Sequence, residues 1–479
     1  MSSPTRPSFY LPAGVLAANL LNMIGIIILP KIIDPDQLAI YSLASSIGLF
    51  LVSMFYEWNR VSISRYSVSK DVLETSRRRS ALRHSNRLTS AVLIVVSLVS
   101  LIYMNNHYGL ILGMACLFAI SQALFEARQA YFRADFQNVS YATSIISRAL
   151  CGLLLISFVG YASNSALYVM LAWCASYFIV LSFTQRRFTA LTKVSPFHWE
   201  TFTFLVKFGS GVTLVAIATT ALQPLVRTLA SEFIPLADSG KLMLAMDIPL
   251  KIVGVIGVSI NILTLQGTMR ASEFGERTLM LERIGMQISI VLAVILPTAV
   301  GFILVKQDFA NAFIPTIYHD IYLQNVGWCM AAAGILVFRN AAIDSIFVIV
   351  GRPHHGLAGP TVAIFLTLIF TWFLLQFGVN SLAFSHGLFL GLLAGTVASW
   401  VVAVKLCNFP VEWGNIGRIL FSTICMAAAV SMFVTSSNLV GLLAKAGLGA
   451  AVYVSFLILT NAFDLRRHLR NIYARRSIQ

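Results

Sequence analysis

About fourteen long apolar stretches divide this sequence of 479 residues, with short polar gaps between them. Each is long enough to cross the hydrocarbon core of a bilayer as a helix, which takes about 20 residues. Their continuous apolarity differs from the roughly ten-residue alternating strands of a membrane barrel. The sequence therefore predicts an all-α polytopic membrane protein with about 14 transmembrane helices, at 9–33, 38–58, 88–105, 109–127, 139–161, 163–184, 202–230, 239–265, 284–305, 324–350, 356–378, 381–404, 417–435 and 438–463.

Composition leaves little room for anything else. Hydrophobic residues make up 58% of the chain and charged residues 11%, whereas a soluble domain carries about 25% charged residues. There is no GxxxxGK[ST] nucleotide-binding sequence, no zinc signature and no CxxC pair among the six cysteines. We therefore expect no cofactor, no bound metal, no catalytic residues and no enzyme activity.

Lys and Arg residues alternate between the gaps. The even-numbered gaps are basic, from the arginine-rich segment 60–87 to Lys405 and Arg418, and so are the two ends of the chain. The odd-numbered gaps contain only Lys31 and Lys306. The positive-inside rule then predicts a multi-pass protein of the cell inner membrane with both termini in the cytoplasm. Because this asymmetry explains most of the net charge of +15, we expect no nucleic-acid partner.

A few cations fall inside the apolar stretches, where topology does not require them. Lys207, Lys241 and Lys445 lie close enough to span ends for their side chains to reach the interface. A charge at mid-bilayer costs about 2.5–3.5 kcal/mol, so deeper ionisable residues usually face a wet cavity or the bundle interior. The deeper set, in which cations outnumber anions, comprises Arg148, Arg227, Lys251, Arg339, Asp247 and Asp344.

This net positive interior favours an anionic substrate. A guanidinium fork matches phosphate oxygens, and exclusion of water strengthens the contact. The sequence thus predicts that a diphosphate or sugar is bound by the four deep cations, namely Arg148, Arg227, Arg339 and Lys251. Asp247 and Asp344 are candidates for coupling transport to an ion.

These charges also have structural interpretations. Asp247 and Lys251 are four residues apart on one helix face and can neutralise each other. Arg339 and Asp344 are five apart and are less well matched within a helix, so Asp344 is expected to pair with another helix. Arg227 lies about two turns from the external end of its span and can reach the interface.

Weak internal symmetry suggests two structural repeats. Pro12-Ala13-Gly14-Val15 opens the first span and Gly209-Ser210-Gly211-Val212 opens the seventh. Transporters are often built from such repeats. We therefore predict an N-terminal lobe at 1–200, a C-terminal lobe at 201–405, and two further helices with a basic tail at 406–479.

Three short stretches resemble a known family. They are 127–134 with Tyr141 and Arg148 after it, 223–227, and 350–353. The chain resembles the O-antigen and exopolysaccharide flippases of the multidrug/oligosaccharidyl-lipid/polysaccharide exporter superfamily. Many members have Asp-Arg where this chain has Val226-Arg227.

The resemblance implies two six-helix lobes forming a V, followed by two C-terminal helices, and alternating access to a central cavity. It implies transport of a polyprenyl-diphosphate-linked oligosaccharide for surface polysaccharide biosynthesis. The implied partners are this lipid-linked oligosaccharide, membrane lipids, and a polymerase and chain-length regulator of the same pathway.

Two alternatives remain open. A cation-coupled multidrug exporter of the same superfamily would need intramembrane carboxylates, but the first span contains neither Asp nor Glu. A membrane enzyme of polysaccharide assembly would be expected to have a large external loop. The longest external gap, 306–323, is short, although it contains Asp308, His319 and Asp320.

Overall fold

The structure is a computed structural model that describes residues 10–67, 72–103, 107–189, 196–273, 276–378, 380–435 and 438–464. These residues form helices joined by short turns, and no strand occurs among them. The all-α prediction is thus confirmed. Some basic residues used to predict topology lie outside the described ranges: Arg6, Lys70, Lys193, Arg466, Arg467, Arg470, Arg475 and Arg476.

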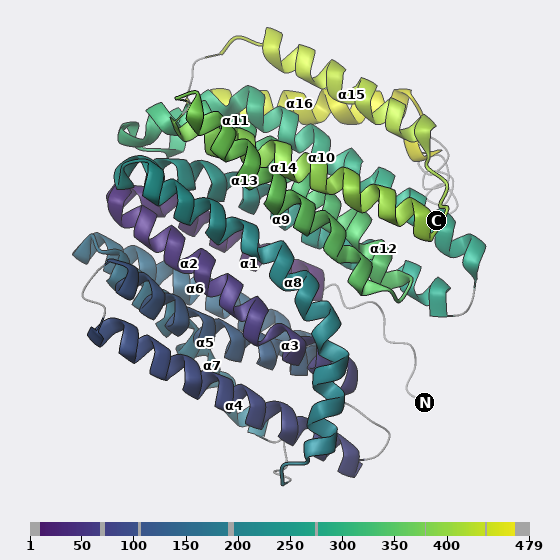
Figure 1. The fold of residues 1–479 in the computed structure, drawn as a ribbon. Coiled ribbons are helices and arrows are strands. Elements are labelled where there is room, and N and C mark those ends of the chain that lie inside the picture. The colour runs from purple at the N-terminus through teal and green to yellow at the C-terminus, as the bar shows by residue number, and fades with distance from the viewer. Residues whose placement is uncertain are drawn as a thin grey trace, which may run out of the picture. The chain divides into compact units, whose positions relative to one another are not determined.

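The α-helices follow one another along the chain with few residues between them (Figure 1). Their bounds are α1 Tyr10–Ile28, α2 Pro35–Phe55, α3 Glu57–Tyr66, α4 Val72–Tyr103, α5 His107–Ala134, α6 Asn138–Ser163, α7 Ala166–Thr189, α8 Trp199–Phe233, α9 Leu236–Glu273, α10 Arg277–Phe313, α11 His319–Phe338, α12 Asp344–Ile349, α13 Ala358–Gln376, α14 Asn380–Leu406, α15 Trp413–Met432 and α16 Leu439–Leu459.

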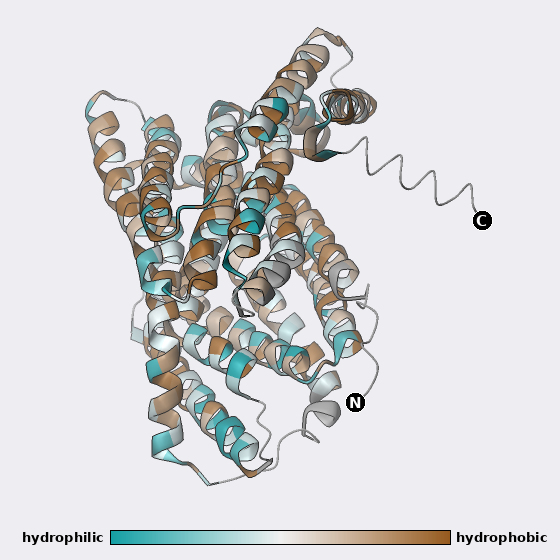
Figure 2. Ribbon diagram, turned by 90° about the vertical axis from the view of Figure 1, so that its right-hand side faces the viewer, coloured by the Kyte–Doolittle hydropathy of each residue, from teal (hydrophilic) through white to brown (hydrophobic). Residues whose placement is uncertain are grey.

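Within the described residues, 13 helical segments are long and apolar enough to cross a membrane. Each falls on one of the predicted spans. The remaining predicted span, 239–265, lies within α9, a helix of 38 residues. Hydrophobic residues occur along the length of the helices, and many hydrophilic residues lie at helix ends and turns (Figure 2). The chain therefore has the organisation of a multi-pass membrane protein.

Most of the described part of the basic segment 60–87 is helical, which its description as a gap did not predict. The short helix α3 contains the first residues of the segment, and α4 begins at Val72 and runs for 32 residues. Arg, Leu and Glu favour helices, and Glu74 accepts a hydrogen bond from Arg78 one turn later at 2.5 Å. The third spanning helix consequently begins well before the apolar stretch 88–105.

The helices group by their contacts into two compact units. Unit 1 comprises 1–244 and 353–368, and unit 2 comprises 245–352 and 369–479. In unit 1, α6 packs on α1 and α7, α5 packs on α2 and α4, and α8 packs on α2 and α3. In unit 2, α11 packs on α10 and α14, while α15 and α16 pack on α10. The predicted lobes, 1–200 and 201–405, were defined by the internal repeats and not by contacts. Their boundary after residue 200 stays a prediction.

Gly240 allows an unusually close approach in unit 1, where α9 meets the start of α2. A Cβ at Gly240 would lie 1.9 Å from the carbonyl oxygen of Pro35. Gly240→Ala is expected to lower the melting temperature in detergent by several degrees, because the backbone oxygen cannot move aside like a side chain. Gly254→Ala in the same helix is the control, since nothing lies within 4 Å of its Cβ position. Equal melting temperatures for the two variants would contradict the close approach.

Candidate functional site

Arg148 lies in the interior of unit 1, on the face of α6 that meets α1 and α7. Only 7% of the residue is exposed. Its guanidinium donates hydrogen bonds to Asn22 Oδ1 at 2.9 Å and to the Tyr177 hydroxyl at 2.6 Å. Its Cζ atom lies 4.7 Å from the ring centroid of Trp173 and 4.1 Å from that of Tyr177. Two aromatic rings and two hydrogen bonds thus fix the direction of this side chain.

The partners of Arg148 are all electrically neutral. No described carboxylate forms an ion pair with it, and its buried Nε has no hydrogen-bond partner within the described structure. Aromatic faces attract a cation but do not neutralise it, and a buried charge without a counter-charge is costly. The arrangement therefore favours an anion as an additional partner.

A cavity of about 190 Å³ adjoins Arg148, with room for several water molecules. Four helices of unit 1 form its wall. Amide, hydroxyl and carboxylate groups share that wall with apolar side chains: Val15, Ala18, Asn19, Asn22, Gln122, Phe125, Glu126, Tyr141, Ile145, Arg148 and Tyr177. The cavity can therefore hold an anionic group at Arg148 and hydroxyl groups at the amides.

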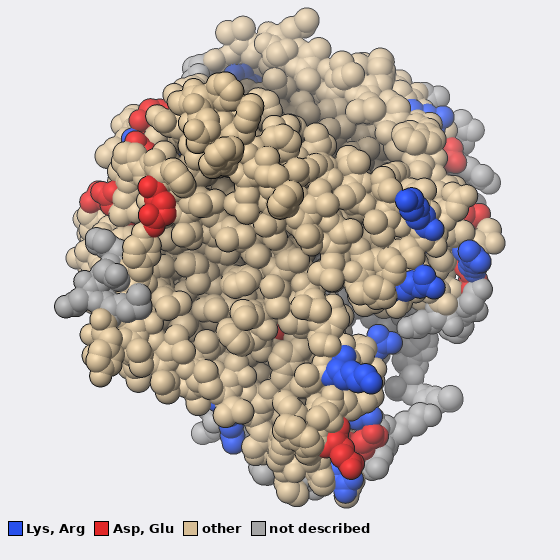
Figure 3. Space-filling model, viewed as in Figure 1, with Lys and Arg blue, Asp and Glu red and all other residues tan. Residues whose placement is uncertain are grey.

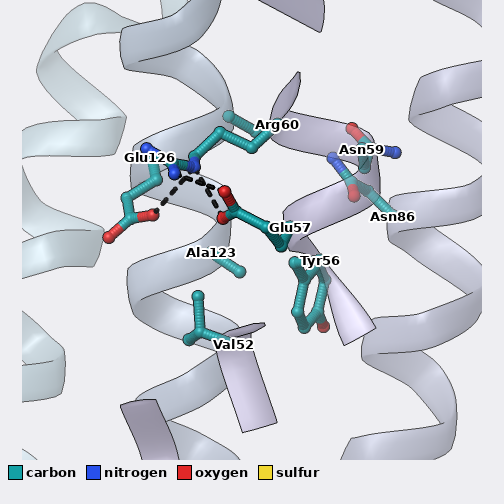
Figure 4. Close-up of a pocket in the computed structure, with 9 residues that line it drawn as sticks. Val52, Tyr56, Glu57, Asn59, Arg60, Asn86, Ala123 and Glu126 are labelled. Atoms are coloured by element: carbon teal, nitrogen blue, oxygen red, sulfur yellow. Dashed lines mark hydrogen bonds and ion pairs between the residues drawn. The ribbon is translucent and has the colours of Figure 1, made fainter. Parts of the chain in front are cut away.

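Glu126 is the acidic residue in this wall, and it faces a second cation. Arg60 is bound to Glu57 by two hydrogen bonds of 2.8 and 2.5 Å, and its Nε lies 4.0 Å from Glu126 (Figure 4). Gln122 also donates to Glu126 at 2.7 Å. Burial is the largest influence and acts to lower the pKa of Arg60, but the charge of Glu57, the hydrogen bonds to it and the charge of Glu126 together outweigh burial, and the pKa lies above its ordinary value. Arg60 thus stays charged and partly balances Glu126.

Arg227 joins α8 to α2 in the interior of unit 1. It is 4% exposed and donates to the carbonyl oxygen of Ser42 at 3.0 Å and to the Ser42 hydroxyl at 2.8 Å. Gln223, one turn earlier, accepts a further bond at 3.3 Å. The residue is not part of the wall of the Arg148 cavity. The side chain of Arg227 is therefore buried against α2. The alternative, in which this side chain reaches the membrane interface, is not what the structure shows.

Arg339 and Asp344 form an ion pair inside unit 2, with Arg339 Nε 3.2 Å from Asp344 Oδ2. The expected mismatch within the helix is wrong, because residues 339–343 form a π-helical turn between α11 and α12. A π-helical turn bonds residue i to residue i+5, which places residues five apart on one face. Gln287 donates to the carbonyl oxygen of Ala341 in this turn at 2.7 Å. Ser399 of α14 donates to Asp344 at 2.9 Å.

Asp247 and Lys251 lie on α9 in unit 2, where Asp247 is half-buried and Lys251 is exposed. Arg339 and Asp344 belong to the same unit, whereas Arg148 and Arg227 belong to unit 1. It stays a prediction that the six deep ionisable residues surround one substrate. Within the described ranges, no group of three or more His, Cys, Asp or Glu residues could hold a metal ion.

The sequence analysis did not select the uncharged polar residues of the cavity wall, such as Asn19, Asn22 and Tyr177. Asn19 and Asn22 are three apart in an otherwise apolar span, and this spacing places them on one helix face. That pair was a usable signal. Gln122 and Glu126 are four apart and share a helix face in the same way, whereas Tyr177 carried no such signal.

The helical organisation places the chain in a class of fold that solved transporter structures share. Structures of a lipid II flippase and of MATE multidrug transporters are similar to the chain along most of its length. The inward closed conformation of the lipid II flippase MurJ shares 14% identity, covers 95% of this chain and 99% of its own, and gives a TM-score of 0.68.

Multidrug transporters show the same likeness. A mutant of the Vibrio cholerae MATE transporter VcmN shares 12% identity with a TM-score of 0.57, over 83% of this chain and 94% of its own. An inward-facing multidrug resistance MATE transporter of the MOP superfamily shares 13% identity with a TM-score of 0.59, over 84% and 97%. No protein-family model and no curated protein matches the sequence. At these identities the likeness establishes the fold.

Proposed function

We propose that this protein is a flippase that moves a polyprenyl-diphosphate-linked oligosaccharide across the inner membrane by alternating access, for surface polysaccharide biosynthesis. The observation that carries the proposal is Arg148, a buried cation with only neutral partners beside a cavity of about 190 Å³. The fold shared with a lipid II flippase supports it. Both termini are placed in the cytoplasm, as the charge alternation predicts.

In this mechanism Arg148 donates hydrogen bonds to phosphate oxygens, and charge-assisted bonds of this kind are about twice as strong as neutral ones. Asn19, Asn22 and Gln122 bind hydroxyl groups of the adjoining sugar, while the prenyl chain stays in lipid. Arg227, Arg339 and Lys251 contribute further positive charge along the path. Arg339 must first leave Asp344 to do so, because the two form an ion pair.

Ion coupling is assigned to Asp344 or Asp247. Asp344 accepts bonds from Arg339 in the same helical segment and from Ser399 of α14, so protonation of its carboxylate would weaken both bonds. A polymerase and a chain-length regulator are the partners that would use the exported oligosaccharide. The flippase itself forms and breaks no covalent bond.

The second candidate is a cation-coupled multidrug exporter, and Glu126 is the observation in its favour. A carboxylate in the cavity wall could attract an organic cation. Arg60 lies 4.0 Å from Glu126 and partly balances its charge, and Arg148 lies in the same wall, so the positive charge of Arg148 opposes such a ligand. The anionic substrate is better supported.

Transport in liposomes tests the proposal. The purified chain is reconstituted with a fluorescent polyprenyl-diphosphate oligosaccharide, and the outer-leaflet fraction is measured with a membrane-impermeant quencher. We expect faster transbilayer movement than in protein-free liposomes, with the lipid recovered at unchanged mass. Ethidium transport without movement of the lipid would instead indicate a drug exporter. A product of altered mass would indicate a membrane enzyme.

A further inference from the structure

Two groups of aromatic side chains form a cluster on unit 1, where α3 packs on the start of α8. Phe202 contacts Trp58, Phe197 and Trp199, with ring centroids 5.8, 5.6 and 5.3 Å away. Tyr66 of α3 packs edge-on against two further rings of α8, those of Phe204 and Phe208, at 5.3 and 4.7 Å. Several of these large rings remain open to the surroundings: Trp199 is 66% exposed, Phe204 49% and Phe197 42%.

Cations lie over this aromatic cluster and beside it. Arg65 lies 5.2 Å from the ring centroid of Phe208, and Arg78, which also bonds to Glu74, lies 5.5 Å from that of Tyr66. Arg77 is adjacent in sequence to Arg78 on α4, and Lys207 is adjacent to Phe208 on α8. Arg65, Arg77 and Lys207 are exposed, and none forms an ion pair with an acidic residue in the part of the chain that is described. Basic side chains are visible at the lower right of Figure 3, over the ends of α4 and α8.

Helix length places these residues at the edge of a membrane. With 1.5 Å per residue, the 32 residues of α4 are about 48 Å long and the 35 residues of α8 about 52 Å. The hydrocarbon core is only about 30 Å thick. The first turns of α4 precede its apolar stretch, and residues 199–207 are the first residues of α8, so both helix starts extend into the headgroup region, where Trp and Tyr rings are enriched.

We propose that this basic–aromatic surface, made of Arg65, Arg77, Lys207, Phe197, Trp199 and Phe204, binds the headgroups of anionic phospholipids. The three cations match the phosphate charge, and the exposed rings occupy the boundary between headgroups and acyl chains. The surface is separate from the Arg148 cavity and does not depend on which substrate is transported.

The test measures lipid retention by the full-length chain. The protein in a neutral detergent is titrated with phosphatidylglycerol or with phosphatidylcholine, and bound lipids are counted by native mass spectrometry. Wild type should retain phosphatidylglycerol preferentially. Arg65→Gln, Arg77→Gln and Lys207→Gln combined should weaken this preference about 100-fold, because each cation near an anionic surface contributes roughly fivefold.

Two comparison variants make the result specific. Lys405→Gln removes an exposed basic residue in unit 2, on α14, and should leave the preference unchanged. Replacing Arg65 and Arg77 with Lys retains the charge and should keep most of the preference, which separates lost charge from misfolding.

Any of three results would overturn the proposal. The triple glutamine variant could retain phosphatidylglycerol like wild type, or Lys405→Gln could lose as much. Inorganic phosphate could displace phosphatidylglycerol more than chloride does at equal ionic strength, which would identify free phosphate as the ligand. Loss of lipid transport in the liposome assay, by contrast, would leave this proposal intact.

Discussion

Arg148→Ala is expected to reduce oligosaccharide export by about tenfold or more at unchanged protein level. The substitution removes the buried guanidinium that borders the cavity of about 190 Å³. Bonds to a charged group contribute about 1.5–3 kcal/mol each, so loss of one should reduce transport roughly 10- to 150-fold, and loss of two should reduce it further. The measurement is the transbilayer rate of the lipid-linked oligosaccharide in liposomes, together with surface polysaccharide in cells lacking the native gene.

Arg148 also connects α1, α6 and α7, so lost stability must be distinguished from lost binding. Arg128→Ala is the matched control, because Arg128 is a partly buried arginine of unit 1 that also donates to neutral groups, the Leu181 carbonyl and the Thr184 hydroxyl. It is not part of the cavity wall. Transport by Arg128→Ala should persist. Arg148→Lys keeps the charge but loses the fork, so it should retain partial transport.

Equal loss in the Arg128→Ala and Arg148→Ala variants would show that only packing matters. Full transport by Arg148→Ala would remove the cationic cavity from the mechanism altogether. Either result would favour the multidrug exporter or the membrane enzyme over the flippase. Glu126 would then be the charged residue of the Arg148 cavity to test next.

Asp344→Ala is expected to destabilise unit 2 by about 3–5 kcal/mol. It leaves Arg339, which is 1% exposed, as a buried charge without its counter-ion. The bond from Ser399 to Asp344, at 2.9 Å, is lost as well. Equilibrium unfolding of the purified chain in mixed micelles, followed by circular dichroism, measures the change.

Replacing both partners should cost much less than replacing one. Arg339→Met combined with Asp344→Leu removes both charges and fills the space with apolar atoms, a change that is often neutral or stabilising for buried pairs. A double-mutant cycle then gives the coupling energy. Additive effects of the single substitutions would show that the pair seen at 3.2 Å contributes no coupling.

The same pair shows where sequence reasoning reached its limit. Spacing by five does not match an α-helix, whose side-chain neighbours are three and four apart. The π-helical turn at 339–343 is stabilised by Gln287, which comes from α10, more than 50 residues earlier in the chain. No local sequence pattern predicts the hydrogen bond between Gln287 and this turn.

Arg148 could be selected from the sequence, but its partners could not. Its depth within an apolar span was enough to select it, because a charge there is expensive and seldom retained without a role. Its surroundings were not predictable. Asn22 is 126 residues away in the chain and Tyr177 is 29 residues away, and only helix packing shows that its partners are neutral.

The sequence by itself determined the helices, their approximate bounds and the residues that carry charge into the membrane. The physical reason is that the bilayer forces each spanning segment to satisfy its own backbone hydrogen bonds, so apolar length alone specifies a helix. Only the tertiary structure decided that Arg339 has an anionic partner and that Arg148 lies beside a cavity with neutral ones. Those facts depend on which helices pack together, and residues far apart in the chain decide that packing.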